Sequence, residues 1–526
     1  MALCRMLFNS FPFIFFFLPV TVVIFFWTAR RSHLLAAAWL TLASLCFYAW
    51  WNYVFLALLG ASIAFNFMLG VGIARATAAG TARRARGLLA FALFVNLAGL
   101  AYFKYANFFL DNVSAVVGVR WSIDTVVLPL GISFFTFTQI AFLVDAYRGR
   151  VTSYHPVHYA LFVTYFPHLI AGPILHHRDM IAQFNRREIY RLDPENVAVG
   201  VTIFSIGLFK KVAIADTMAL FSSPVFGAAA SGHAVSFVAA WGGVLAYTFQ
   251  LYFDFSGYCD MAIGISRLFG IQLPLNFNSP YKATSVIDFW RRWHMTLSQF
   301  LRDYLYIPLG GSRGRPARHH VNLMITMLLG GLWHGAGWTF VVWGALHGVY
   351  LVVNHAWRMR RPRTTTHGAV RCHIGRHASR ALTFVTVVIG WVFFRAESIA
   401  DASRILAGMS GATGFRTPAY FADAVDSMPV IRVLRDLGLP APPAGVLLIV
   451  LSGLLALVWL APNTQQIMGS YSRALDPYPD AAGEPRRGRL RWRPVPAAAI
   501  AIGLMFFASL LGLITDSPSE FLYFQF

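Results

Sequence analysis

NFNSPYKATSVIDFWRRWHMTLSQFLRDYLYIPLGG, residues 276–311, and LLGGLWHGAGWTFVVWGALHG, residues 328–348, decide the fold class of this chain. Both stretches are rich in aromatic and apolar residues, and each contains one prominent histidine, His294 or His334. A charged imidazole is costly to keep in such surroundings. An ionisable group inside apolar sequence is therefore a candidate functional residue, and both histidines are candidates for catalysis.

The first stretch begins with the Ser-x-x-Asp pattern of a helix start, formed by Ser285 and Asp288. Apolar residues then recur at helical spacing, and Gly310 and Gly311 end the segment. The pattern predicts one helix, with His294 about 80° from the centre of its apolar stripe. A histidine in that position can pack and still reach a polar cavity.

The second stretch surrounds His334 with glycines and has tryptophans close by. Glycines let backbones or a substrate approach closely. If segments 320–334 and 338–356 form a hairpin, His334 lies near its turn. The alternative is a structural histidine, hydrogen-bonded inside a helix bundle.

The composition indicates a membrane protein. Of 526 residues, 57% are hydrophobic and only 12% are charged, about half the share that soluble domains carry. The net charge of +21 is compatible with a nucleic-acid binder, but the basic residues lie in short loops between apolar runs. That distribution is the positive-inside pattern, so we expect anionic lipid as a contact and no nucleic acid.

Spans of about 20 apolar residues predict an all-α, polytopic bundle of about 11–12 helices around a central cavity. Residues 1–526 are expected to form a single integral-membrane domain. Shorter or broken apolar pieces, at 159–175, 257–273 and 320–334, are expected to be re-entrant or buried. The predicted spans are 11–28, 33–50, 54–74, 88–104, 126–144, 197–214, 236–253, 338–356, 381–396, 444–461 and 494–514.

Orientation follows from the basic loops. With these loops in the cytoplasm, both termini lie outside a bacterial inner membrane. The basic loops are Arg30–His33, Arg75–Arg86, Arg178–Arg191, Arg313–Arg318, Arg358–Arg380 and Arg486–Arg493. Residues 1–28 are interpreted as a retained anchor, because no small-residue cleavage site precedes Arg30.

Signatures of soluble enzymes are missing from the sequence. It contains no Walker A, H-E-x-x-H or H-x4-D motif, and its four cysteines show no metal-ligand spacing. One G-x-S-x-G string surrounds Ser312, but it lies in a basic loop and is interpreted as chance. No metal site is predicted. Asp254 and Asp260 stand inside apolar sequence and are expected to pair with an arginine or join a hydrogen-bond network.

Both opening stretches resemble the core of the membrane-bound O-acyltransferase family, in particular its bacterial branch that O-acetylates exported polysaccharides such as alginate. The matching residues are DFWRRWHMTLSQFLRDYLYIPLGG and GGLWHGAGW, in order and spacing. The resemblance covers nearly the whole chain. It implies an acyltransferase in which His334 is the general base, for which a near-neutral pKa suits imidazole. His294 would orient the substrate, stabilise the oxyanion or hold the acyl donor.

Further residues are predicted to line the site or to act beside it. Arg291 and Arg292 either meet lipid phosphate or contact the phosphates of a donor such as acetyl-CoA; no cofactor is expected to stay bound. Asp288 is also read as a helix-start residue, and His347 as a packing partner. Asn276 and Asn278, before Pro280, are interpreted as turn residues that can also line the site. The residues expected to line the site are Asn278, Asp288, Arg291, Trp293, Ser298 and Trp333.

The C-terminal FLYFQF has two interpretations. An aromatic tail after a last span anchors at the membrane interface. Tyr523 also offers a hydroxyl, and the tail resembles those of family members and small partner proteins, so it is a possible acyl relay to an outer-side enzyme.

The sequence therefore predicts a membrane acetyltransferase that works with extracytoplasmic acetyltransferase partners on a polysaccharide. A rival in the same chemistry is D-alanyl transfer to teichoic acid. Rivals from other classes are a transporter, although no repeated halves are visible, and a scaffold of an export complex.

Overall fold

The computed structural model describes residues 6–118, 125–151, 155–170, 172–360, 369–428, 431–432, 435, 445–471, 474–475, 491–515 and 521–522. These residues form helices and no β-strand, which confirms the all-α prediction. The chain divides into two compact units. The prediction of a single membrane domain stays a prediction, because two compact units can belong to one domain.

The first unit comprises Met1–Phe204, Tyr258–Pro274 and Arg473–Asp476. Its core is aromatic: the Phe8 ring stacks on Tyr258 at 4.9 Å and contacts Phe13, Phe47 and Phe166. The helices that lie wholly in it are η1 Phe13–Phe17, α1 Leu18–Ala29, α2 His33–Trp51, α3 Val54–Ala78, α4 Ala82–Val117, α5 Ile132–Tyr147, α6 Pro156–Thr164, α7 Phe166–Leu169, α8 His177–Phe184 and η2 Arg187–Tyr190.

An amide pair joins two long apolar helices of this unit. Asn66 on α3 and Asn96 on α4 each donate to the other's carbonyl oxygen, at 3.2 and 2.7 Å. Both are buried, and such reciprocal bonds hold helices together where apolar packing alone has little directional preference. His168, which is also in this unit, is bonded through Nε2 to the Phe162 carbonyl.

The second unit comprises Ser205–Gly257, Leu275–Ser472 and Pro477–Phe526. Two helices, α9 Pro194–Phe209 and α11 Phe237–Leu268, run from one unit into the other. The other helices of this unit are η3 Lys210–Ala215, α10 Asp216–Ala230, η4 Pro280–Lys282, α12 Val286–Trp290, α13 Met295–Leu301, η5 Arg302–Tyr306, α14 Pro316–His334, α15 Trp338–Arg360, α16 Ala369–Arg395, α17 Ile399–Met409, α18 Tyr420–Ser427, α20 Val446–Leu460, α21 Thr464–Ile467 and α22 Pro496–Thr515.

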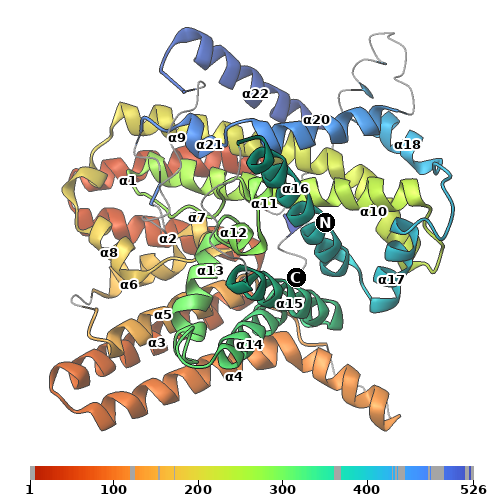
Figure 1. Ribbon diagram of the computed structural model, residues 1–526. Helices are drawn as coiled ribbons and strands as arrows, with labels where there is room; N and C mark the ends of the chain where they lie inside the picture. Colours follow the sequence, from red (N-terminus) through yellow and green to blue (C-terminus); the bar gives the residue numbers. More distant parts are fainter. Residues whose placement is uncertain are drawn as a thin grey trace. The chain divides into compact units, whose positions relative to one another are not determined.

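Helices α14 and α15 form the predicted hairpin and lie side by side (Figure 1). Glycines set their separation. A Cβ on Gly331 would stand 2.3 Å from the Phe340 carbonyl oxygen, and one on Gly344 would stand 2.5 Å from that of Met327. Because backbone atoms occupy this space, only glycine permits the contact. The hairpin places His334 at the last position of α14.

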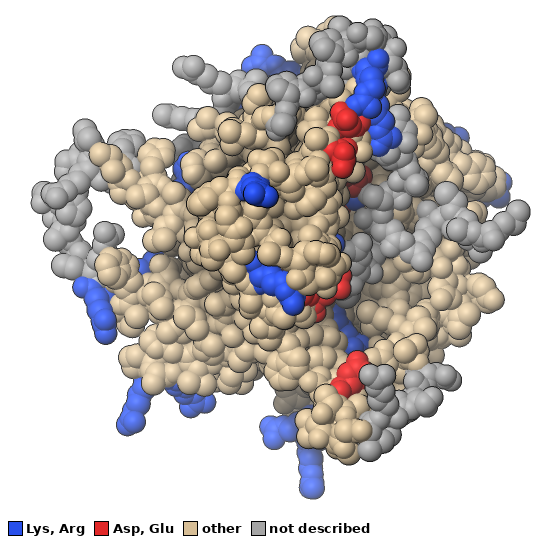
Figure 2. Space-filling model, turned by 90° about the vertical axis from the view of Figure 1, so that its right-hand side faces the viewer, with Lys and Arg blue, Asp and Glu red and all other residues tan. Residues whose placement is uncertain are grey.

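Large hydrophobic side chains are exposed on several helices, for example Phe94 on α4, Leu448 on α20 and Ile514 on α22, as expected of a membrane protein. Figure 2 shows a face on which residues other than Lys, Arg, Asp and Glu predominate. Among the described residues, six helices are long and apolar enough to cross a membrane, and three shorter apolar helices accompany them. Nine of the eleven predicted spans fall in these helices: His33–Trp51, Val54–Ala78, Ala82–Val117, Pro194–Ala230, Ile374–Arg395, Pro496–Ile514, Phe13–Ala29, Ile132–Tyr147 and Val446–Leu460.

The two remaining predicted spans, 236–253 and 338–356, lie in α11 and α15, which are not among these helices. Tryptophan, tyrosine, glycine and polar residues dilute the apolar content of both. Segment 257–273, expected to be re-entrant or buried, is buried over most of its length, and its first part continues α11 to Leu268. At its start Gly257 does not break the helix; it lets α11 approach the backbone of α9, because a Cβ there would lie 2.7 Å from the Gly207 carbonyl oxygen.

Candidate active site

The stretch around His294 is not one helix. Ser285 does cap α12, since its hydroxyl oxygen accepts from the Asp288 N–H at 3.2 Å. However, α12 ends at Trp290, and α13 begins only at Met295. Residues 276–278 run beside the break: Asn278 N–H donates to the Arg292 carbonyl at 2.9 Å, and Met295 N–H donates to the Asn276 carbonyl at 3.0 Å. These long-range bonds replace the helical ones, so the prediction of a continuous helix was wrong.

His294 occupies the break in a strained conformation. Its φ of 43° and ψ of 53° lie in the left-handed region, which non-glycine residues rarely adopt. Among the described residues only Ser279 shares a positive φ without being glycine. Such strain costs about 1–3 kcal/mol and gathers at functional sites. It turns the imidazole away from the helix border expected for it and buries it completely.

Asn276 determines the tautomer of His294. Its side-chain oxygen lies 3.1 Å from His294 Nδ1 and accepts from the Thr296 N–H and hydroxyl, at 3.3 and 2.9 Å. An oxygen that accepts from three sides requires a donor at Nδ1. The proton of neutral His294 is therefore assigned to Nδ1, and the lone pair to Nε2.

Burial keeps this histidine uncharged. It lowers the pKa of His294 to about 3, because the protonated ring would lose its hydration. His294 is not part of a candidate membrane span, since residues 286–301 belong to none of the helices that are apolar enough to span a membrane. The ring packs perpendicular to Phe255 of α11 at 4.8 Å, measured between centroids. His294 is thus neutral at pH 7.

His334 lies beside His294, with 6.2 Å between the ring centroids. The Trp333 indole contacts both imidazoles, at 5.9 Å from His294 and 4.9 Å from His334. Trp343 of α15 and Phe394 of α16 meet His334 at 5.1 and 5.2 Å. The two histidines, 40 positions apart in sequence, therefore share one aromatic enclosure inside the second unit.

A layer of indoles continues from this enclosure. Trp293 packs at 4.9 Å from Trp391, which stacks at 6.0 Å from Trp343. His347 is fully buried in the same layer, and its Nδ1 accepts from the Trp290 indole N–H at 3.3 Å. The structure thus places Trp293 and His347 in packing positions, and for His347 this was the expectation.

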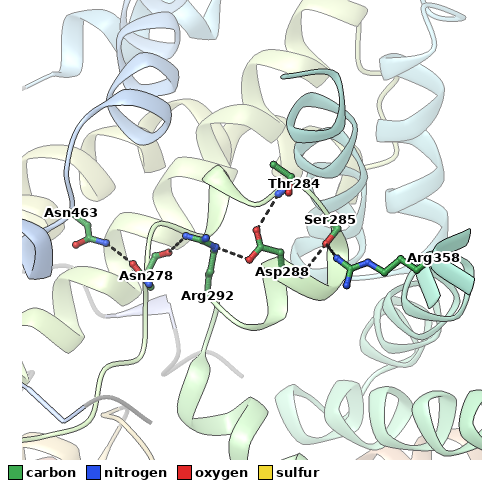
Figure 3. Close-up of polar contacts among 7 residues, drawn as sticks. All are labelled: Asn278, Thr284, Ser285, Asp288, Arg292, Arg358 and Asn463. Atoms are coloured by element: carbon green, nitrogen blue, oxygen red, sulfur yellow. Dashed lines mark hydrogen bonds and ion pairs between the residues drawn. The ribbon is translucent and has the colours of Figure 1, made fainter. Parts of the chain in front are cut away.

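Asp288 belongs to a polar network that fixes the backbone around the break (Figure 3). One carboxylate oxygen pairs with Arg292 Nε at 2.9 Å, and the other accepts from the Thr284 N–H at 3.2 Å. The Asn278 side-chain oxygen accepts from Asn463 at 3.0 Å. Arg358 donates to the Ser285 hydroxyl at 3.2 Å. Asp288 and Asn278 therefore hold segments together here.

The comparisons with known proteins identify the family. A family model described as membrane-bound O-acyltransferase matches residues 84–386. A peptidoglycan O-acetyltransferase of Helicobacter pylori is 45% identical over 438 residues, which cover 78% of this chain and 80% of that protein. A probable alginate O-acetylase AlgI of Azotobacter vinelandii is 39% identical over 99% of this chain and all of that protein. A teichoic acid D-alanyltransferase of Streptococcus thermophilus is 29% identical over 45% of this chain.

This chain belongs to the membrane-bound O-acyltransferase family. It is an O-acyltransferase and a multi-pass membrane protein, as the resemblance implied.

The remaining predicted site residues of this acyltransferase are placed as follows. Trp333 touches both histidines, whereas the Ser298 hydroxyl donates to the Trp293 carbonyl at 3.4 Å and Arg291 is exposed. Tyr523 lies outside the described residues. Within the described part of the chain, no group of three His, Cys, Asp or Glu side chains could hold a metal ion.

The sequence indicated Asn276 and Asn278 together as turn residues that can line the site, and the structure places Asn276 at His294. Both flank Phe277, and nothing in their spacing separates them. Phe255 and Phe394 were not predicted, because both come from helices distant in sequence. The one available signal for Phe255 was its place beside Asp254, a carboxylate in apolar sequence.

Proposed function

We propose that this acyltransferase takes acetyl from acetyl-CoA at the cytoplasmic side and delivers it across the inner membrane for O-acetylation of an exported polysaccharide. The observation that carries the proposal is the pair His294 and His334 around Trp333. A neutral imidazole in an apolar enclosure is suited to take a proton from an attacking hydroxyl. Two relatives are named for O-acetylation of peptidoglycan and of alginate, which supports acetyl as the group and a polysaccharide as its destination.

His334 is the general base in this proposal. A hydroxyl attacks the thioester carbonyl as His334 accepts its proton. A C–O bond forms, the C–S bond breaks, and the leaving thiolate takes up the proton from the His334 imidazolium, which restores the neutral base. His294 has its lone pair on Nε2, so it accepts rather than donates there. We assign it to holding the donor through an amide N–H of the pantetheine arm, with the exposed Arg291 available for the donor's phosphates.

Tyr523 supplies the attacking hydroxyl in the proposed route. Its phenol oxygen forms an acetyl ester, and an extracytoplasmic acetyltransferase partner then carries the acetyl group to the polysaccharide hydroxyl, which restores the phenol. The alternative, an aromatic anchor, needs no hydroxyl at this position.

D-alanyl transfer to teichoic acid has weaker support. Similarity to the Streptococcus thermophilus D-alanyltransferase covers 45% of this chain, against 99% for the Azotobacter vinelandii protein.

The test measures acetate released by mild base from the exported polymer, together with the amount of the protein in membranes. We expect His334→Ala to abolish acetylation at normal protein levels, and Tyr523→Phe to do the same because it removes one oxygen and keeps the ring. Wild-type acetylation in His334→Ala would remove the general-base assignment. Full acetylation in Tyr523→Phe would leave the tail as an anchor and require direct transfer to the acceptor.

A further inference from the structure

A deeply buried lysine, which the proposed acyl transfer does not use, lies in the second unit. Lys211 lies in the π-helix η3 between α9 and α10, and its side chain is 2% exposed. Its Nζ is 2.7 Å from an Asp254 oxygen and 2.8 Å from an Asp216 oxygen. Pairing of Asp254 was predicted, although with an arginine. A buried ion pair in a membrane protein is costly, and π-helical turns are frequent at functional sites, so this pair calls for a role.

The pair contacts the C-terminal tail. Leu522 N–H donates to the second Asp254 oxygen, Oδ2, at 3.1 Å. The Phe521 ring lies over the ammonium, with its centroid 5.0 Å from Lys211 Nζ, within the range of a cation–π contact. Phe521 and Leu522 are buried. Asp254 thus divides its oxygens between Lys211 and the tail.

The docked tail and His294 both contact helix α11. Asp254 and Phe255 are consecutive residues of α11, and the Phe255 ring packs perpendicular to the His294 imidazole. Asp254, Phe255, His294 and Leu522 all belong to the second unit. One helix therefore contacts the tail at one position and the candidate catalytic enclosure at the next. The residue that follows Leu522 in the chain is Tyr523.

We propose that the Lys211–Asp254 ion pair is the receptor for the chain's own C-terminal tail and positions Tyr523 for acyl transfer. This rests on the relay in the proposed function. The carboxylate gives the tail a charged acceptor for a backbone N–H, and the ammonium gives Phe521 a cation to cover. Neither contact requires a particular side chain at position 523, so docking and chemistry can be separated by mutation. Lys211 and Asp254 are positioning residues, since neither reacts.

The first readout is protection of the tail. Purified full-length protein is treated with a carboxypeptidase, and loss of the last residues is followed by mass spectrometry. The test variant is the double change Lys211→Met with Asp254→Leu, which removes both fully buried charges together. Asp216, the second partner of Lys211, keeps its charge, and its side chain is 27% exposed. We expect its tail to be digested at least about tenfold faster than that of the wild type, the scale of one lost hydrogen bond to a charged group.

The matched control is Asp401→Asn. Asp401 is also buried and ion-paired, with Arg404 at 2.7 Å, but it lies on α17. In the Asp401→Asn variant and in Tyr523→Phe, the C-terminal tail should resist carboxypeptidase as well as the wild-type tail does. Unchanged protection in the double variant would overturn the docking site, whatever its activity.

Acetylation is then measured in the same double variant. Loss of acetylation together with release of the tail is the expected result. A released tail with wild-type acetylation would overturn the positioning role and would leave the docking contact standing, and the tyrosine relay would then be judged by Tyr523→Phe alone. Loss of acetylation in Tyr523→Phe with a protected tail would support the relay independently of docking, so failures of the two proposals are distinguishable.

Discussion

At the scale of single residues, the site depends on how one asparagine oxygen is shared. Asn276 accepts from Thr296 twice and from His294 Nδ1, while the main chain at His294 is held in the left-handed region. The strain at His294 is sustained because bonds to residues 276–278 hold both sides of the break. The result is a neutral imidazole with a defined lone pair at Nε2.

The tautomer and the charge state of His294 can be tested with Asn276→Asp. A carboxylate beside Nδ1 favours the imidazolium, so it raises the pKa of His294 from about 3 toward its usual 6.5. In the wild type, His294 stays neutral between pH 8 and 5, so its protonation causes no loss of activity in that range. We expect the variant to lose activity as the pH falls through the raised pKa. The measurement is the pH profile of acetyl transfer in detergent.

Asn278→Asp is the control for the added charge. Asn278 lies two residues away and bonds to Asn463, so its variant should keep the wild-type profile shape. Coincident profiles for Asn276→Asp and wild type would contradict the assigned tautomer and the need for a neutral ring.

Sequence alone could indicate both histidines as candidate site residues, because an ionisable residue in apolar sequence is unusual. It could not predict the left-handed backbone at His294. That conformation results from pairing with residues 276–278, a tertiary contact that overrides the helical periodicity of residues 285–304.

At the scale of elements, the glycines of α14 and α15 place His334. The predicted hairpin is confirmed, and the close approach of its helices explains the glycines around Trp333. Packing this tight transmits small changes: separating α14 from α15 moves His334 relative to Trp343.

We expect Gly331→Ala to cost about 1–3 kcal/mol of stability, as overpacking does, and to reduce acetyl transfer by about tenfold or more. The added Cβ would meet the Phe340 carbonyl at 2.3 Å, and a backbone atom cannot move aside cheaply. Thermal unfolding in detergent and the acetylation assay measure the two effects. Gly337→Ala is the control, because its Cβ would find its nearest atom at 3.6 Å. Equal behaviour of the two variants would show that the close helix contact does not position the site.

At the scale of the whole molecule, hydropathy predicted most of the apolar helices, since length and composition suffice for that. It did not predict the division into two units, nor that α11 runs through both as one helix of 32 residues. Glycines that break a helix and glycines that admit a neighbouring helix look alike in sequence, which is why the burial of segment 257–273 was predicted but its continuity with α11 was not. Orientation in the membrane stays a prediction from the positive-inside pattern.

Orientation is tested by labelling single cysteines in a background without the four native ones. Ala79 is exposed at the end of α3, in the first strongly basic loop, and Ser231 is exposed after α10, in a loop without Lys or Arg. Because basic loops stay in the cytoplasm, a membrane-impermeant maleimide should label Ser231→Cys in intact spheroplasts and Ala79→Cys only after permeabilisation. The reverse pattern would place the basic loops outside. Acetyl-CoA would then meet the wrong face of the enzyme, and the tail would end on the cytoplasmic side, where Tyr523 could not serve an outer partner.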